Sequence, residues 1–186
     1  MVGCCSFGAH QIAIGLASVT FMIVTGVSSA TTIRVSHQYS KGDFVGMKRA
    51  ANASFHLVLV FMMFTAMTFI WFRYQLPELY SNNQSVINLS AQLLIIAAIF
   101  QLFDGMQVVS LGALRGLADV KHAMIYSVIS YILISLPLGY VFAFSLQWGV
   151  MGLWLGFIAG LGTASVFFYT RFRKLYKALT GGVNNK

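Results

Sequence analysis

The sequence predicts an all-α membrane protein built from five transmembrane helices. Of its 186 residues, 58% are hydrophobic and only 9% are charged, and the mean hydropathy is +0.78. A soluble domain carries about 25% charged residues, so this composition excludes an ordinary soluble domain. The apolar residues gather in five long runs, separated by short polar or basic stretches. The runs lack the strict alternation of a membrane β-barrel strand, which leaves helices.

Each run holds roughly 20 or more mostly apolar residues, the length that an α-helix needs to cross a bilayer. In chain order, the predicted spans are residues 12–33, 50–72, 86–114, 123–146 and 150–170. The third is longer than a bilayer requires, so we expect it to tilt or to extend beyond the hydrocarbon core.

The fourth and fifth spans carry further local signals. Pro137, with a glycine two residues later, removes a backbone donor inside the fourth span and predicts a kink there. Only residues 147–149 separate the two spans, which predicts a tight antiparallel hairpin. Gly152, Gly156 and Gly160 are spaced by four, a pattern typical of a helix face that packs closely against another helix.

Basic residues set the predicted orientation. If the spans alternate in direction, 11 of the 12 Lys and Arg residues fall on one side, and Arg73 is alone on the other. The positive-inside rule then places the first side, with a basic tail at residues 171–186, in the cytoplasm of a multi-pass inner-membrane protein. The formal net charge of +8 therefore indicates membrane orientation rather than a nucleic-acid partner. The predicted outer ends carry aromatic residues suited to an interfacial belt, namely Trp71, Tyr74, Tyr80 and Trp148.

Five spans and a cytoplasmic carboxyl terminus would place the amino terminus outside. A complete five-span protein is one possibility, because a short amino terminus can cross a membrane unaided. The alternative, which we favour, is that the chain is a fragment of a longer polypeptide, because residues 1–10 read like the end of a preceding helix and a short turn.

Asp104 is the most informative residue of the chain. It lies inside the third apolar run, eleven residues before Arg115, which marks the end of that run. Eleven residues of helix span about 16 Å, which places Asp104 near the midplane of a core about 30 Å thick. A carboxylate at that depth costs at least about 2.5 kcal/mol to insert, and such residues usually serve ion or substrate movement.

Two glutamines flank this carboxyl at helical spacing. Gln101, Asp104 and Gln107 recur every three residues and would share one sector of a helix. Such a sector faces protein or water rather than lipid. We interpret it as a cation or proton site on a cavity wall; the alternative is a buried carboxyl that only bonds a neighbouring helix. The small and hydroxyl residues at positions 25–32 could equally line a cavity or pack helices.

The remaining polar residues give no support to an enzyme. The four histidines lie far apart, and no pair has the i, i+4 spacing of a helical metal site. Metalloprotease, phosphate-loop and nucleophile-elbow motifs are absent from the sequence. We therefore expect no catalytic residues, no metal apart from a possible sodium ion at Asp104, and no cofactor beyond a coupling ion. Arg115 and Asp119 lie four residues apart, which predicts a local ion pair.

Several segments resemble multidrug and toxic compound extrusion transporters, with the NorM-like branch the nearest match. The matching segments follow the family's order from its eighth to its twelfth helix: Gly8-Ala-His-Gln-Ile-Ala-Ile, residues 18–22, Ser29-Ala-Thr-Thr-Ile-Arg-Val, Leu111-Gly-Ala-Leu-Arg-Gly-Leu-Ala-Asp, Leu136-Pro-Leu-Gly-Tyr and Gly149-Val-Met-Gly-Leu-Trp-Leu-Gly.

This resemblance implies that residues 1–186 form most of the carboxyl-terminal six-helix lobe of a twelve-helix transporter. The partners would be the missing amino-terminal helices, the lipid bilayer and a drug-like small molecule. The implied activity is export of bulky, often cationic compounds, driven by inward sodium ions or protons. Asp104 matches the acidic residue implied in cation coupling, and Gln11 matches a position near the drug site in some members of the family. Phe21 and Phe100 match aromatic positions that are often tyrosine in relatives, and phenylalanine lacks that hydroxyl.

Other functions remain open at this stage. Lipid-linked oligosaccharide flippases and polysaccharide exporters share the fold, although the segment around Asp104 and the Leu114-Arg-Gly sequence argue against them. A non-transporting membrane subunit, or a non-functional fragment, would keep the helices without needing Asp104.

Overall fold

The computed structural model describes residues 2–181, and it describes the side chains of residues 7–180. Within this part of the chain all the regular structure is helical. The elements are α1 (Val2–Ser40), α2 (Phe44–Trp71), α3 (Gln75–Glu78), α4 (Gln84–Gly116), α5 (Val120–Val128), the π-helical η1 (Ile129–Ser135), α6 (Leu136–Tyr140), the π-helical η2 (Val141–Ser145) and α7 (Gly149–Gly181).

The elements from residue 120 to residue 145 follow one another without a break and form a single rod. Counted in this way, five rods are long and apolar enough to cross a membrane, which confirms the prediction of five membrane-spanning helices. The helices are generally longer than the predicted spans. In particular, α7 continues to Gly181. The segment expected as a basic tail from residue 171 is therefore helical for as far as the structure describes it, because nothing in its sequence stops the helix. Residues 182–186 of that tail lie outside the described part.

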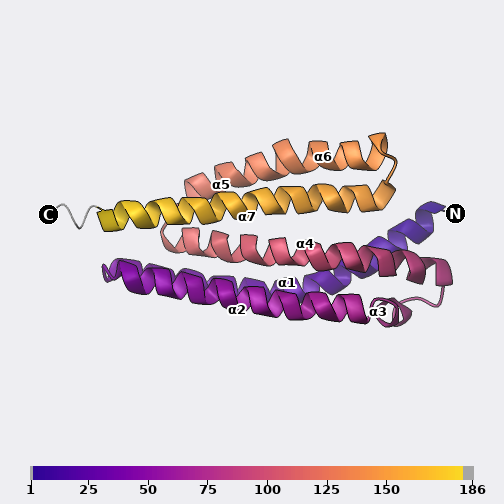
Figure 1. Ribbon diagram of the computed structural model, residues 1–186, viewed down its shortest axis with the longest axis horizontal. Coiled ribbons are helices and arrows are strands. Elements are labelled where there is room, and N and C mark those ends of the chain that lie inside the picture. Colours follow the sequence, from indigo (N-terminus) through magenta and orange to yellow (C-terminus); the bar gives the residue numbers. More distant parts are fainter. Residues whose placement is uncertain (1, 182–186) are drawn as a thin grey trace.

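Helix α4 is the centre of the bundle. Figure 1 shows it between α1 and α2 on one side and α7 on the other, and it packs against all three of these helices. The rod formed by α5, η1, α6 and η2 packs mainly on α7. Two groups of buried apolar residues fill the bundle, one around Phe55 and Phe168 and the other around Leu94 and Trp154. The position of α4 places Asp104 inside the bundle instead of at its rim.

Small residues set the distances between the rods. A Cβ atom at Gly156 would collide with the backbone of Gly139, and one at Gly152 would meet the backbone of Phe142. A Cβ atom at Gly160 would collide with the Ser135 side chain. The glycine face predicted from the fifth span is therefore confirmed as a packing face, and its partner is the preceding rod of the hairpin.

Pro137 lies between two stretches of wider helical turns. The Leu136 amide bonds to the Tyr131 carbonyl, and the Leu146 amide bonds to the Val141 carbonyl, so both bonds reach back five residues. A proline has no amide hydrogen and cannot donate the usual helical hydrogen bond. Wider π-helical turns beside it let the helix continue despite the missing bond. The interruption expected at Pro137 thus takes the form of widened turns on both sides of it.

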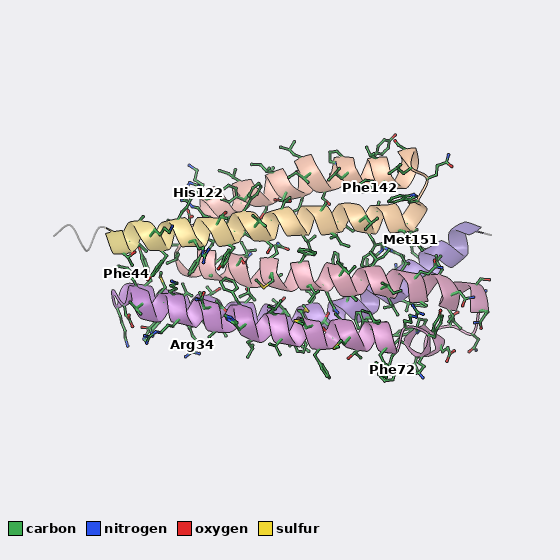
Figure 2. The ribbon with its side chains drawn as sticks, in the orientation of Figure 1. Arg34, Phe44, Phe72, His122, Phe142 and Met151 are labelled. Carbon is green, nitrogen blue, oxygen red and sulfur yellow. The ribbon has the colours of Figure 1, made fainter. Side chains whose placement is uncertain are left out.

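The two ends of the bundle differ in chemistry. In Figure 2, Arg34, Phe44 and His122 lie at one end, while Phe72, Phe142 and Met151 lie toward the other. The first end holds the α1–α2 and α4–α5 turns and the end of α7, which carry most of the basic residues. The second end holds the exposed aromatic side chains expected for an interfacial belt, namely Trp71, Tyr74, Tyr80 and Trp148.

Candidate functional site

Asp104 lies on the wall of two cavities that share it and Phe21. The first, which we call the aromatic cavity, has a volume of about 260 Å³. The second, the hydroxyl cavity, has a volume of about 270 Å³. Residues of α1 and α4 line both cavities, together with α7 in the first and η1 in the second, and the Asp104 side chain is half-buried between them. A single carboxylate is therefore accessible from two chemically different spaces.

The aromatic cavity has a largely fixed wall. Phe100 from α4 packs edge-on against Trp154 from α7, with ring centroids 5.2 Å apart. The Trp154 indole is 1% exposed, and its Nε1 donates to Nδ1 of His10 at 3.1 Å. Phe21 from α1 is half-exposed on the opposite side. Aromatic faces next to a carboxylate are suited to an organic cation with apolar groups.

The hydroxyl cavity presents oxygen atoms from α1. Ser28 and Thr32 donate hydrogen bonds to the carbonyls of Val108 and Gly112 on α4, at 2.8 and 2.9 Å. These bonds hold α1 against α4 and leave hydroxyl lone pairs free, because each hydroxyl oxygen can also accept. The same cavity is lined by Thr25, Ser29, Asp104, Gln107, Arg115 and Tyr131, among others. The residues at positions 25–32 therefore do both things that the sequence left open: they pack helices and line a cavity.

No partner neutralises Asp104 within the described part of the chain. None of the salt bridges or side-chain hydrogen bonds found there involves its carboxylate. Arg115 lines the same cavity three turns away along α4. Carboxylate and hydroxyl oxygens are the ligand types that hard cations such as sodium prefer, so the residues present fit a bound cation or a proton.

The other predicted site residues divide into two groups. Phe21, Phe100 and Gln107 line the cavities together with Asp104. Gln101 lines neither of them: it is 1% exposed, its Oε1 accepts from Thr20 at 3.3 Å, and its Nε2 has no hydrogen-bond partner among the described atoms.

The geometry of α4 explains why Gln101 and Gln107 separate. Three residues of α-helix turn through about 300°, so successive members of an i, i+3 series shift by about 60°. Gln101 and Gln107 therefore point about 120° apart. Gln101 points toward Thr20 of α1, and Gln107 points into the hydroxyl cavity.

Gln11 is exposed and lines neither cavity. It precedes Ile14, Ser18 and Phe21 along one stripe of α1, and these three residues do line the aromatic cavity. Helical spacing of three and four residues places Gln11 on the same face, one turn beyond the cavity wall.

The structure adds site residues that sequence reasoning missed. Tyr131 belongs to η1 and Trp154 to α7, yet each reaches a cavity that also contains Asp104. Neither residue stands in a recognisable motif around Asp104. Their proximity depends on how separate rods pack, and no spacing along the chain signals it.

A separate polar cluster joins the α4–α5 turn to α7. Asp119 Oδ2 accepts from Nε of Arg171 at 2.7 Å, and Asp119 Oδ1 accepts from Nδ1 of His122 at 2.5 Å. The sequence predicted an Arg115–Asp119 pair, and this prediction is wrong. Helix α4 ends at Gly116 and Ala118 adopts a positive φ of 59°, so Asp119 turns away from Arg115 and toward α7. Burial alone would raise the pKa of Asp119, but the bonds from Arg171 and His122 lower it below its ordinary value.

Comparison with known proteins gives a consistent result. The family model described as MatE matches residues 2–141. A probable multidrug resistance protein NorM of Xanthomonas campestris pv. campestris is 40% identical over 181 residues, which cover 97% of this chain and 40% of the relative. The multidrug resistance protein NorM of Aliivibrio fischeri is 39% identical over 168 residues, or 88% of this chain and 36% of the relative.

Solved structures share the fold. The eukaryotic MATE transporter AtDTX14 superposes with a TM-score of 0.85 at 16% identity, over 96% of this chain and 41% of that transporter. An inward-facing multidrug resistance MATE family transporter superposes with a TM-score of 0.83 at 15% identity, over 93% and 40% of the two chains. This chain thus spans about 40% of the length of the proteins that it matches.

Proposed function

Because this chain belongs to the MatE family, we propose that it forms part of an ion-coupled exporter of bulky, often cationic compounds. The coupling ion is sodium or a proton, and export is across the inner membrane. The working protein would include further helices, because the relatives named as multidrug resistance proteins are about two and a half times as long. The family consists of transporters, so the chain is not an enzyme.

The observation that carries the proposal is the position of Asp104 between the two cavities. A carboxylate that is half-buried between an aromatic and a hydroxyl-lined cavity, and that pairs with no cation among the described residues, can take either an ion or a cationic substrate. Binding of one neutralises the charge that attracts the other. Competition of this kind is what an exchanger needs, because each ligand then favours release of its rival.

The two cavities would divide this task. The hydroxyl cavity supplies oxygen atoms suited to a small cation, and the aromatic cavity supplies ring faces suited to an organic one. Phe21 borders both spaces, so a movement of its half-exposed ring would alter both at once. Phe21 and Phe100 contribute faces but no ligand oxygen.

The test is Asp104→Asn in the complete transporter that contains this chain. Asparagine keeps the size and the polarity of the side chain but removes its charge and its titration. We expect the variant to reach the membrane at normal levels and to lose ion-driven efflux of ethidium, measured by fluorescence in energised vesicles.

Asp104→Glu is the matched control, since it keeps the carboxylate and should retain part of the efflux. Glu78→Gln removes a carboxylate from the exposed α3 and should leave efflux unchanged. If ion-dependent efflux by Asp104→Asn equals that of the unaltered protein, Asp104 has a structural role only and the proposal fails.

A further inference from the structure

A groove on the outer surface of the bundle lies apart from Asp104, between α2 and α7. Its volume is about 320 Å³. Phe55 and Met106 form the floor, and Leu59 and Val166 form apolar sides that are exposed to the surroundings. Asn52 is also on the wall, nearer the α1–α2 end of the bundle. Within the described residues nothing covers this open side, and its exposed apolar walls suit contact with lipid.

Two cations lie at one mouth of the groove. Lys48 Nζ lies 4.9 Å from the ring centroid of Tyr176, and the Arg173 guanidinium lies 5.0 Å from that of Tyr169. Tyr169 is itself a wall residue, and its ring packs edge-on against Phe55 at 5.5 Å. Each cation therefore lies against an aromatic ring, Lys48 one helical turn before Asn52 and Arg173 one turn after Tyr169.

These cations are free to bind an anion. The salt bridges found among the described residues use Asp119, Arg171 and His122, and neither Lys48 nor Arg173 takes part. Both side chains are exposed, and Figure 1 shows α2 and α7 extending beyond the end of α4 at this end of the bundle. The positive charge also disfavours a cationic drug as the occupant.

The dimensions match one lipid chain. Lys48 and Leu59 are eleven residues apart on α2, or about 16 Å along the helix. Half the thickness of a bilayer core is about 15 Å. A headgroup phosphate beside Lys48 and Arg173 would thus place its acyl chain along Asn52, Phe55 and Leu59, ending near the midplane.

We propose that this groove binds an anionic phospholipid, with the phosphate at Lys48 and Arg173 and one acyl chain between α2 and α7. The inference does not depend on the proposed function, because it uses neither Asp104 nor its cavities. The lipid would fill the space that α2 and α7 leave open and would stabilise their contact at the end of the bundle where α4 stops.

Photo-crosslinking in nanodiscs tests the proposal. The full 186-residue chain is placed in phosphatidylcholine nanodiscs with a small fraction of phosphatidylglycerol that carries a diazirine on one acyl chain. We expect crosslinks at residues 52–59 and 165–169, mapped by peptide mass spectrometry. The double variant Lys48→Gln/Arg173→Gln should reduce this yield by about tenfold.

The control variant Lys41→Gln/Lys121→Gln removes two charges from the same end of the bundle but away from the groove, and its yield should stay unchanged. Val166→Trp tests the apolar part separately, since the indole fills the groove and should reduce crosslinking with both cations intact. In the unaltered chain, excess unlabelled phosphatidylglycerol should compete and inorganic phosphate should not.

Three results would overturn the proposal. The first is an absence of crosslinks at these residues in the unaltered chain. The second is an equal yield from a diazirine-labelled phosphatidylcholine, which would show lipid contact without selection for charge. The third is an equal loss in the control and groove variants, which would show a general effect of surface charge.

Discussion

Two aspartates of this chain lie in opposite electrostatic surroundings. Asp119 is held by the guanidinium of Arg171 and the imidazole of His122 at the end of the bundle. Asp104 lies between cavities, and no cation neutralises it within the described residues. A satisfied carboxylate stabilises one arrangement of helices, whereas an unsatisfied one is available to a ligand. The two residues therefore suit different roles although both are acidic and lie only fifteen positions apart.

Asp119→Asn should weaken the connection between the α4–α5 turn and α7. Removing the charge that accepts from Arg171 should cost about 1–3 kcal/mol of stability at neutral pH. The pKa of Asp119 is lowered in the folded chain, so its stabilising effect is present above the unfolded pKa of about 4 and is lost as the pH falls through the folded value.

The measurement is the thermal unfolding midpoint in detergent, taken from pH 8 down to pH 3. The midpoint of Asp119→Asn should lie below that of the unaltered chain at pH 7, and the difference should shrink below about pH 4. Glu78→Gln serves as the control at an exposed carboxylate outside this cluster. A difference that stays constant across the whole range would rule out the charge of Asp119 as the cause.

At the scale of the helices, close backbone approach is the feature that places side chains. Gly112 on α4 lies against the backbone of Ser28 on α1, and Gly105 lies against Met62 on α2. These contacts let α4 pack near both helices, while Asp104, one residue from Gly105, lines the cavity that α1, α4 and η1 enclose. In lipid, where apolar burial favours association only weakly, such van der Waals contact is a main source of helix packing.

Gly156→Ala tests the glycine face of α7. The new Cβ atom would collide with the Gly139 backbone and lie 3.1 Å from the Ser135 carbonyl oxygen. Backbone atoms cannot move aside like a flexible side chain, so the two rods must separate, at a cost of about 1–3 kcal/mol. We expect a lower thermal midpoint and lower abundance in the membrane.

The matched control for this change is Gly26→Ala, where nothing lies within 4 Å of the added Cβ atom. Alanine favours helix over glycine by about 1 kcal/mol, so this control should be neutral or slightly stabilising. Equal midpoints for the two variants would show that contact between α7 and the preceding rod does not limit stability.

At the scale of the whole molecule, the bundle is polarised along its length. Most basic residues gather at the end with the α1–α2 and α4–α5 turns, while exposed aromatic residues mark the other end. This arrangement predicts that the basic end lies in the cytoplasm, where Lys and Arg are retained during insertion.

Single-cysteine labelling tests that orientation. In a background in which Cys4 and Cys5 are replaced, Lys41→Cys and Asn83→Cys place a thiol in the α1–α2 turn and before α4. We expect an impermeant maleimide added to intact cells to label Asn83→Cys but not Lys41→Cys. Permeabilised cells provide the control, since both variants should then react. Labelling of Lys41→Cys alone in intact cells would reverse the orientation.

Much of the fold was predictable because membrane-spanning helices can be recognised from local amino-acid composition. A bilayer requires about 20 apolar residues for each helix, and every such run in this chain became a rod of the bundle. The glycine spacing of the fifth span likewise predicted a close packing face, and Gly156 lies against Gly139. The end of α7 was not predictable in the same way, because a helix that leaves the membrane can continue in water, and no stop signal precedes residue 181.

The sequence by itself determined five membrane-crossing helices, the asymmetry of their charged ends and an acidic residue at depth. Each of these follows from how individual residues partition between water and lipid, and partitioning depends on local composition. Only the tertiary structure decided which polar groups meet. Gln101 meets Thr20 of α1, Asp119 bonds to Arg171 instead of Arg115, and Tyr131 reaches the cavity of Asp104. Those pairings depend on how the packed helices are rotated and spaced. Rotation and spacing are in turn determined jointly by many residues that are distant in sequence.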